Sequence, residues 1–291
     1  MSPEELGFRI PLGEWIETGV DWVTAAFGLL FDAIRTVLVA AFDATEAVLT
    51  GPPWWAVVVV LAALAVWAKG WRLGLGALAG FVVVIGVDQW DNAMASLALV
   101  LVASVIALAI GIPLGVWAAR NDRVSATVRP VLDFMQTMPA FVYLIPVVVI
   151  FRAGVVPGLV ATIIFALAPG VRFTELGIRR VDREVVEAGH AFGAPPGRIL
   201  RQIQMPLAMP TIMAGVNQVI MLSLSMVVIS GLAGTRGLGR EVVSALSTID
   251  IALGFEAGLA VVILAIYLDR ITSALTSRSP VARALATTAA R

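Results

Sequence analysis

Long hydrophobic runs separated by small groups of charged residues dominate the chain from residue 54 to residue 268. We interpret seven of these runs as candidate membrane spans, at 54–68, 73–87, 93–118, 138–151, 157–171, 207–230 and 251–268. Several are shorter than the roughly 20 residues that an untilted helix needs to cross a bilayer. Flanking Trp, Gly and Pro residues are expected to extend them. The pattern therefore predicts an all-α polytopic membrane protein with about seven transmembrane helices.

The segment before residue 54 has a different pattern. At 100° per residue, the acidic residues and the one arginine between residues 14 and 46 fall within an arc of about 80° on a helical wheel. Seven apolar residues fall within a second arc of about 80°, centred about 140° away: Ile16, Val20, Val23, Phe27, Leu30, Ile34 and Leu38. One helix, or two in phase, would lie in the membrane interface, and Gly51-Pro52-Pro53 would separate it from the first span. A surface anchor and a scaffold that braces the outer rim of a transporter both fit this pattern.

Composition narrows the functional class. Hydrophobic residues make up 59% of the chain and charged residues 14%, against about 45–50% and about 25% in soluble domains. The zero net charge gives no basic footprint for nucleic acid. With no cysteine and one histidine, His190, the chain has little material for a disulfide framework, a metal site or nucleophilic catalysis. The first residues, MSPEELGFRI, lack the basic and apolar regions of a signal peptide.

The distribution of Lys and Arg predicts the orientation. With segment 172–206 in the cytoplasm, most of them lie on the cytoplasmic side. The opposite side holds Arg9, Arg35, Arg152, Arg236 and Arg240. Because cytoplasmic loops are enriched in Lys and Arg, we expect an N-terminus outside and a C-terminus in the cytoplasm.

Segment 172–206 carries its own helix start and stop signals. Asp182 is a suitable N-cap, and the helix it begins would run to Phe192, with Gly193 as a left-handed residue beyond the helix end. Pro196 can open a second short helix, which would stop near Pro206. The signals predict a cytoplasmic helix–turn–helix.

Small residues on the first of these helices, Ala188 and Gly189, are expected to be exposed together with Gly193, where a partner's backbone can approach closely. For His190, a plain polar contact is favoured over a pH-sensing role.

The same segment resembles the cytoplasmic loop of permeases of ATP-binding-cassette (ABC) importers. That loop reads EAA, three residues, Gly, nine residues, then I-x-L-P. Here Glu187-Ala188-Gly189 is followed at the same spacing by Gly193 and by Ile203-Gln204-Met205-Pro206, with Gly189 and Met205 departing from the pattern. The resemblance implies that the ATPase-coupling residues are Glu187, Ala188, Gly189, Gly193, Ile203 and Pro206.

The resemblance extends over residues 8–272, to the permeases of bacterial glycine betaine/proline betaine uptake systems. The stretches that carry it are IPLGEWIETGVDWV (10–23), MQTMPAFVYLIP (135–146), VVPGLVATIIFALAPGVRFTELGI (155–178), MPLAMPTIMAGVNQVIMLSLSMVVI (205–229) and VILAIYLDR (262–270). It implies a type I ABC importer permease core and a homodimer in the bacterial cytoplasmic (inner) membrane. The expected partners are two ABC ATPase subunits and an extracytoplasmic substrate-binding protein.

The sequence itself agrees that ATP binding and substrate capture belong to separate partner chains. The chain has no G-x-x-x-x-G-K-[ST] sequence, so ATP and Mg²⁺ are expected on the partner ATPase and no cofactor on this chain. In 291 residues we expect no fused receptor domain. The expected organisation is an extracytoplasmic segment 1–53, two peripheral helices in 54–92, a five-helix core in 93–272 with the coupling segment 172–206, and a cytoplasmic tail 273–291.

The implied cargo is a betaine-type zwitterion with a quaternary ammonium group; choline, carnitine or another small compatible solute is the alternative. Aromatic faces attract such ammonium groups. The candidate substrate-pathway residues are Phe134, Gln136, Thr137, Phe141, Tyr143 and Asn217, for each of which ordinary helix packing is the competing interpretation. Two rival classes are a passive channel and a membrane-embedded enzyme. The coupling motif argues against the channel, and the lack of a catalytic cluster argues against the enzyme.

Two further expectations concern the outer side. A carboxylate inside a span is costly, so the last span is expected to begin after Glu256. The Gly-rich stretch 231–239 is interpreted as a flexible connector.

Overall fold

The computed structural model describes residues 11–277, and every regular element in this range is a helix. The elements are α1 (Leu12–Ala26), α2 (Gly28–Thr50), α3 (Trp54–Lys69), α4 (Trp71–Gly86), α5 (Trp90–Arg120), α6 (Asp122–Thr137), α7 (Ala140–Phe151), α8 (Val155–Arg179), α9 (Arg183–Ala191), α10 (Pro196–Ile199), the π-helical turn η2 (Leu200–Gln204), α11 (Met205–Leu232), α12 (Leu238–Thr248) and α13 (Ile251–Ser277). The predicted all-α fold is confirmed. Arg9 and most of the expected tail lie outside the described residues.

Four helices are long and apolar enough to cross a bilayer on their own: α5, α8, α13 and the continuous helix formed by α10, η2 and α11. Two bent helix pairs, α1 with α2 and α6 with α7, raise the number to six if each pair is one span. Helices α3 and α4 are apolar but have 16 residues each, a length of about 24 Å against a hydrocarbon core of about 30 Å. The described residues thus hold four to six candidate spans, where the hydrophobic pattern predicts about seven.

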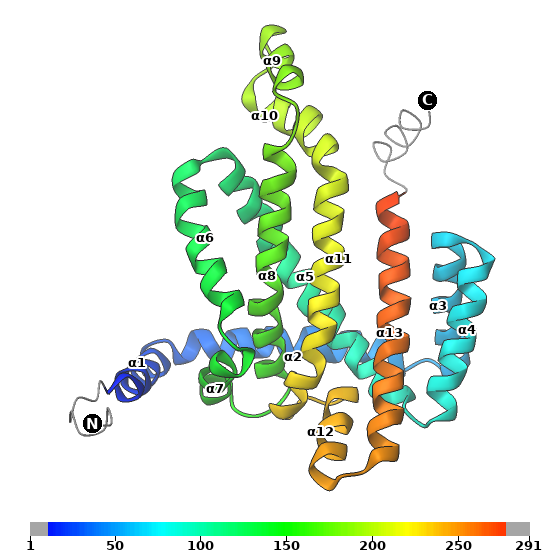
Figure 1. Cartoon of the computed structure of the whole chain (residues 1–291). Helices are drawn as coiled ribbons and strands as arrows, with labels where there is room; N and C mark the ends of the chain where they lie inside the picture. The colour runs from blue at the N-terminus through cyan, green and yellow to red at the C-terminus, as the bar shows by residue number, and fades with distance from the viewer. Residues whose placement is uncertain (1–10, 278–291) are drawn as a thin grey trace, which may run out of the picture.

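The predicted span 138–151 corresponds to helix α7, but it is too short to be a span by itself. Helix α7 has only 12 residues, about 18 Å, and it is bent by 96° from α6. Met138 and Pro139 at the bend are extended, because a proline disfavours the α conformation of the residue before it. The chain between α5 and α8 is therefore a broken pair whose longer arm is α6, which runs beside α8 (Figure 1).

The N-terminal amphipathic segment forms two helices, α1 and α2, with a bend of 80° at Phe27. Figure 1 shows α2 lying crosswise to α8 and α11, the orientation expected of a helix in the membrane interface. Helix α1 buries no side chain, whereas α2 buries Leu38 and Phe42. Only the second of the two helices is thus part of the packed body.

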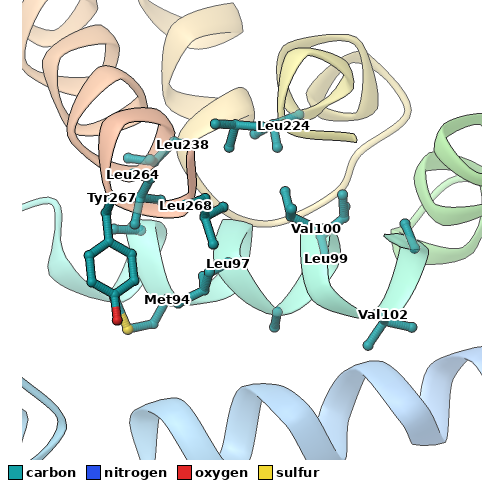
Figure 2. Close-up of a cluster of buried hydrophobic side chains, with 14 of the residues drawn as sticks. Met94, Leu97, Leu99, Val100, Val102, Leu224, Leu238, Leu264, Tyr267 and Leu268 are labelled. Carbon is teal, nitrogen blue, oxygen red and sulfur yellow. The ribbon is translucent and has the colours of Figure 1, made fainter. Parts of the chain in front are cut away.

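The largest hydrophobic cluster is built around α5. Figure 2 shows α5 side chains, among them Met94, Leu97 and Val100, beside Leu264 and Leu268 of α13 and Leu224 of α11. All of these side chains are buried. In a bilayer, where lipid is as apolar as the side chains, the stabilisation comes from close packing.

Glycines and small hydroxyl residues let α5, α8 and α11 approach closely. A Cβ on Gly111 of α5 would lie 3.3 Å from the carbonyl carbon of Gly170 in α8. Ser104 of α5 donates a hydrogen bond to Ser223 of α11 over 3.1 Å. Small residues and interhelical hydrogen bonds are typical of helix contacts in membranes, so these three helices form the central frame.

The stretch 231–239 is packed and leads into α12, so its interpretation as a flexible connector is wrong. A Cβ on Gly231 would lie 2.4 Å from the carbonyl carbon of Gly239. The Thr235 hydroxyl donates to the Gly154 carbonyl over 3.2 Å and is buried. These glycines serve close backbone approach rather than mobility.

The expectation that the last span begins after Glu256 is also wrong. Helix α13 begins at Ile251, which puts Glu256 in its second turn with a partly exposed side chain. The Asp250 carboxylate accepts the backbone N–H of Leu253 over 3.1 Å. This side-chain cap fixes the start of the helix ahead of the glutamate.

Candidate coupling site and transport pathway

The segment between α8 and α11 projects beyond the end of the helical bundle (Figure 1). The predicted coupling segment 172–206 begins earlier, since its residues up to Arg179 belong to α8. The projecting part consists of α9, a tight turn, and α10 with η2, which lead directly into α11. From here on, the coupling segment means residues 180–206.

The limits of α9 follow from local chemistry, as predicted. The Asp182 carboxylate accepts the backbone N–H of Glu184 over 3.0 Å, a cap that stabilises a helix by about 1 kcal/mol. At the other end, Gly193 has a φ of +73°. Its N–H donates to the His190 carbonyl, and the N–H of Ala194 donates to the Gly189 carbonyl. This hydrogen-bond pair is a Schellman motif, and it fixes the turn that reverses the chain.

The second arm differs from the prediction that it ends near Pro206. Residues Pro196–Leu232 form one continuous helix that includes the π-helical turn η2. The N–H of Met205 donates to the carbonyl of Leu200, five residues back. Pro206 has no N–H to donate and follows the widened turn directly, so the helix absorbs it without ending.

The two arms pack through Gly189. A Cβ on this residue would lie 2.8 Å from the Cδ1 atom of Ile203 and 3.4 Å from Ile199. Gly189 is buried, so its predicted exposure is wrong: its small size serves contact between the arms. Ala188 and Glu187 are exposed, as are Gly193 and the His190 side chain.

Phe192 is the exposed residue that the sequence pattern does not single out. It lies at the tip of the segment and is 91% exposed. Aromatic side chains, phenylalanine among them, are enriched in protein–protein interfaces. The position of Phe192 directly before the left-handed Gly193 is the sequence signal that predicts an exposed tip.

A polar network surrounds the end of α8, where the coupling segment begins. The Glu175 carboxylate is 6% exposed and accepts from Ser125 at 2.7 Å and from Arg129 at 2.8 Å, both of α6. Arg179 forms an ion pair with Glu175 at 2.9 Å and donates to the Ala118 carbonyl of α5 over 2.8 Å. The network joins α5, α6 and α8, and it is absent from the sequence prediction because its members are far apart along the chain.

Five of the six candidate pathway residues belong to the bent pair α6–α7. Phe134 and Phe141 are 63% and 50% exposed, Gln136 is partly exposed, and the Thr137 hydroxyl donates to the Asp133 carbonyl. Tyr143 is buried, and its hydroxyl has no hydrogen-bond partner within the described residues.

Asn217, the sixth, lies elsewhere. Its amide donates to Asp269 of α13 over 3.3 Å and its oxygen accepts from Thr272. The candidate set is thus divided between the α6–α7 pair and the contact of α11 with α13.

Within residues 11–277 no group of three His, Asp or Glu side chains could hold a metal ion.

A solved structure shares this arrangement of helices. It is an inward-facing MetNI methionine ABC transporter, with a TM-score of 0.59, 20% sequence identity, and coverage of 65% of this chain and 94% of that chain. At this identity the likeness shows the fold: the chain is a membrane protein with the fold of type I ABC importer permeases.

Sequence comparison gives the family. Residues 111–279 match the family described as binding-protein-dependent transport system inner membrane component. The glycine betaine transport system permease protein OpuAB of Bacillus subtilis (strain 168) is 46% identical over 264 residues, 91% of this chain and 94% of its own length. The glycine betaine/proline betaine transport system permease protein ProW of Escherichia coli (strain K12) is 44% identical over 266 residues, 91% of this chain and 75% of its own. The chain belongs to this family of multi-pass inner-membrane transport components.

Proposed function

We propose that the chain is the transmembrane permease subunit of an ATP-driven importer that moves glycine betaine/proline betaine-type zwitterions into the cytoplasm. The observation that carries this proposal is the coupling segment. Its motif residues Glu187 and Ala188 and its Phe192 are exposed, and relatives named as betaine permeases match nine tenths of the chain, which together support the proposal.

The proposed assembly is a homodimer with two ABC ATPase subunits and a separate extracytoplasmic substrate-binding protein. In this assembly each ATPase binds ATP and Mg²⁺ and contacts the tip of one coupling segment. An exposed aromatic side chain next to a polar helix face fits a partly apolar groove on such a partner. Substrate selection is assigned to the binding protein, so choline or carnitine remains the alternative cargo.

We propose that the coupling segment faces the cytoplasm. In Figure 1 the coupling segment, the α3–α4 and α5–α6 turns and the end of α13 all lie at one end of the bundle. Lys69, Arg72, Arg120 and Arg123 lie at this end, as the enrichment of Lys and Arg in cytoplasmic loops requires. Helix α2 then lies at the extracytoplasmic interface.

The proposed substrate pathway runs along the α6–α7 pair. Phe134 and Phe141 expose aromatic faces that can contact a quaternary ammonium group. Among the described residues the Tyr143 hydroxyl has no hydrogen-bond partner, which suits a transient hydrogen bond to a passing carboxylate. We assign Asn217 a structural role in addition to any role in the pathway, because both the nitrogen and the oxygen of its side-chain amide form hydrogen bonds with α13.

Gly193→Asp provides the test. The chain, the ATPase and the binding protein are reconstituted in proteoliposomes, and ATP hydrolysis, labelled betaine uptake and ATPase co-purification are measured. The variant should insert normally but lose ATPase association or coupled uptake, because it places an unpaired charge at the contact. Gly193→Asn is the matched control: it has nearly the same size, tolerates the left-handed conformation and adds no charge. Normal coupled uptake by Gly193→Asp, or uptake by the permease alone without ATP, would contradict the proposed function.

A further inference from the structure

Helix α6 has a small apolar contact with α8. Among its residues only Ser125 and Leu132 are buried; Leu132 packs against buried residues of α8, with the partly buried Val128 and Met135 beside it. Because this apolar contact is small, polar contacts contribute strongly to holding α6 against α8.

The strongest of these polar contacts converge on one atom. Oε1 of Glu175 accepts from the Ser125 hydroxyl at 2.7 Å, from Nη2 of Arg129 at 2.8 Å, and pairs with Nε of Arg179 at 2.9 Å. Arg179 in turn pairs with Asp122 at 2.8 Å. With 6% of its side chain exposed, Glu175 is shielded from water in this arrangement, so these partners compensate its charge in place of solvent.

This network lies where a force on the coupling segment enters the bundle. Glu175 lies about one helical turn before Arg179, the residue at which α8 ends. Helix α9 begins shortly afterwards, at Arg183. On the other side of the network, α6 leads into α7. Glu175 thus connects the base of the coupling segment to the helix pair that carries most of the candidate pathway residues.

We propose that Glu175 is a positioning residue for transport: its carboxylate fastens α6 to the base of the coupling segment, so that displacement of α9 carries α6 and α7 with it. This inference rests on the proposed contact between α9 and an ATPase. Because separating α6 from α8 would break the hydrogen bonds that Ser125 and Arg129 donate to Glu175, the two helices move as one unit.

The same pair of helices offers a matched control. Arg172 of α8 also pairs with Asp133 of α6, but both side chains are largely exposed, at 40% and 65%. Water and salt replace such a contact at little cost. Glu175→Gln and Asp133→Asn therefore each remove one carboxylate charge from an α6–α8 contact, and only the first removes it from a buried site.

The first experiment separates coupling from assembly. Proteoliposomes with the ATPase and the binding protein are assayed for ATPase association, ATP hydrolysis and labelled betaine uptake. Glu175→Gln should retain ATPase association while betaine uptake per ATP hydrolysed falls at least fivefold; Asp133→Asn should keep a ratio within twofold of the parent. Arg129→Gln should show an intermediate loss, which Arg129→Lys partly restores because it keeps the charge.

The second experiment measures the movement itself and needs no ATPase. Since the chain has no cysteine, spin labels can be placed on introduced cysteines at exposed Ala126 of α6 and exposed Ala191 of α9. The purified permease in nanodiscs should give a narrow distance distribution between the labels. Glu175→Gln should broaden this distribution and Asp133→Asn should leave it unchanged.

The outcomes are distinct. If the parent chain fails to bind an ATPase, the proposed function is wrong, and the distance measurement still tests the link between α6 and α9. Normal coupling by Glu175→Gln or by Arg129→Gln would overturn the positioning role of Glu175, and so would an equal effect of Asp133→Asn. Should Glu175→Gln fail to fold, the comparison of Arg129→Gln with Arg129→Lys tests the positioning role. Both variants keep the contacts of Ser125 and Arg179 with the Glu175 carboxylate.

Discussion

Two glycines of the coupling segment, Gly189 and Gly193, limit an added side chain for different physical reasons. Gly193 has a positive φ of +73°, a backbone conformation that favours glycine, and within the described part of the chain no atom lies within 4 Å of where a Cβ would be. Gly189 has ordinary helical geometry, and the neighbouring Ile203 limits the space. The nearest obstacle there is the far end of a flexible side chain, which can shift.

Position 189 should therefore tolerate the single side-chain carbon of alanine but not the three side-chain carbons of valine. We expect Gly189→Ala to be neutral or stabilising, because alanine gains up to about 1 kcal/mol of helix propensity while Ile203 rotates away. Gly189→Val should push the two arms apart and reduce ATPase association. Thermal unfolding and ATPase co-purification check both variants. A loss of association in the alanine variant equal to that in the valine variant would show that Gly189 itself contacts the partner.

Tyr143 allows transport to be tested apart from stability. Its buried hydroxyl has no hydrogen-bond partner among the described residues, so Tyr143→Phe removes no internal bond and should leave the unfolding temperature unchanged or slightly raised. If this hydroxyl bonds the substrate during passage, betaine uptake should fall several-fold with ATPase association intact. Uptake equal to that of the parent chain would remove Tyr143 from the proposed pathway.

At the scale of elements, α1 and α2 should differ in importance although both are amphipathic. Helix α1 buries no side chain. Helix α2 buries Phe42 completely, and its Asp43 and Glu46 each pair at 3.2 Å with Arg236, whose guanidinium lies over the Phe42 ring. The second helix thus fastens the turn between α11 and α12 to the body of the protein.

Truncation should reveal this difference. Removal of residues 1–26 should shift the unfolding temperature of the permease in detergent by only a few degrees. Removal of residues 1–50 should lower it much more, because loss of a buried phenylalanine alone costs about 3–5 kcal/mol. Equal unfolding temperatures for the two truncated chains would mean that α2 is only a surface anchor.

The helices that the sequence predicts well are those whose ends depend on local chemistry. Asp182, Gly193 and Pro196 fix the coupling segment through their own side chains and backbone angles, so spacing suffices to find them. Pro206 misleads, because a π-helical turn that no propensity scale signals lets the helix continue through it. The span 138–151 misleads for a related reason: hydropathy measures solvent preference and does not register the bend before Pro139.

Of the candidate site, only the coupling motif could be predicted from the sequence. The coupling residues form one short stretch with fixed spacing, whereas Glu175 and Arg129 are 46 residues apart and meet only in the folded chain. Hydrophobic periodicity cannot show such a contact. In the same way, Asn217 looks like a free polar group in an apolar run, yet the fold bonds it to Asp269.

For the molecule as a whole, the pair α8–α11 is joined at both ends. The coupling segment connects them at one end. At the other, the Gly154 N–H donates to the Ala233 carbonyl at 2.9 Å, and Ser230 shares a hydrogen bond with Thr162 at 3.3 Å. Because interfaces of this kind are closely packed and resist continuous deformation, a force at the coupling segment should move the pair as a rigid body.

The last prediction tests this rigidity far from the ATPase contact. A Cβ on Gly158 of α8 would lie 2.3 Å from Oγ1 of Thr235 and 2.8 Å from Cβ of Ser230, so Gly158→Val must open the far end of the pair. Gly76→Val is the control: it makes the same change within α4, where nothing lies within 4 Å. We expect Gly158→Val to retain ATPase association but to lower receptor-stimulated ATP hydrolysis and betaine uptake severalfold, while Gly76→Val stays near the parent. Unchanged uptake in Gly158→Val would mean that the two ends of the α8–α11 pair move independently.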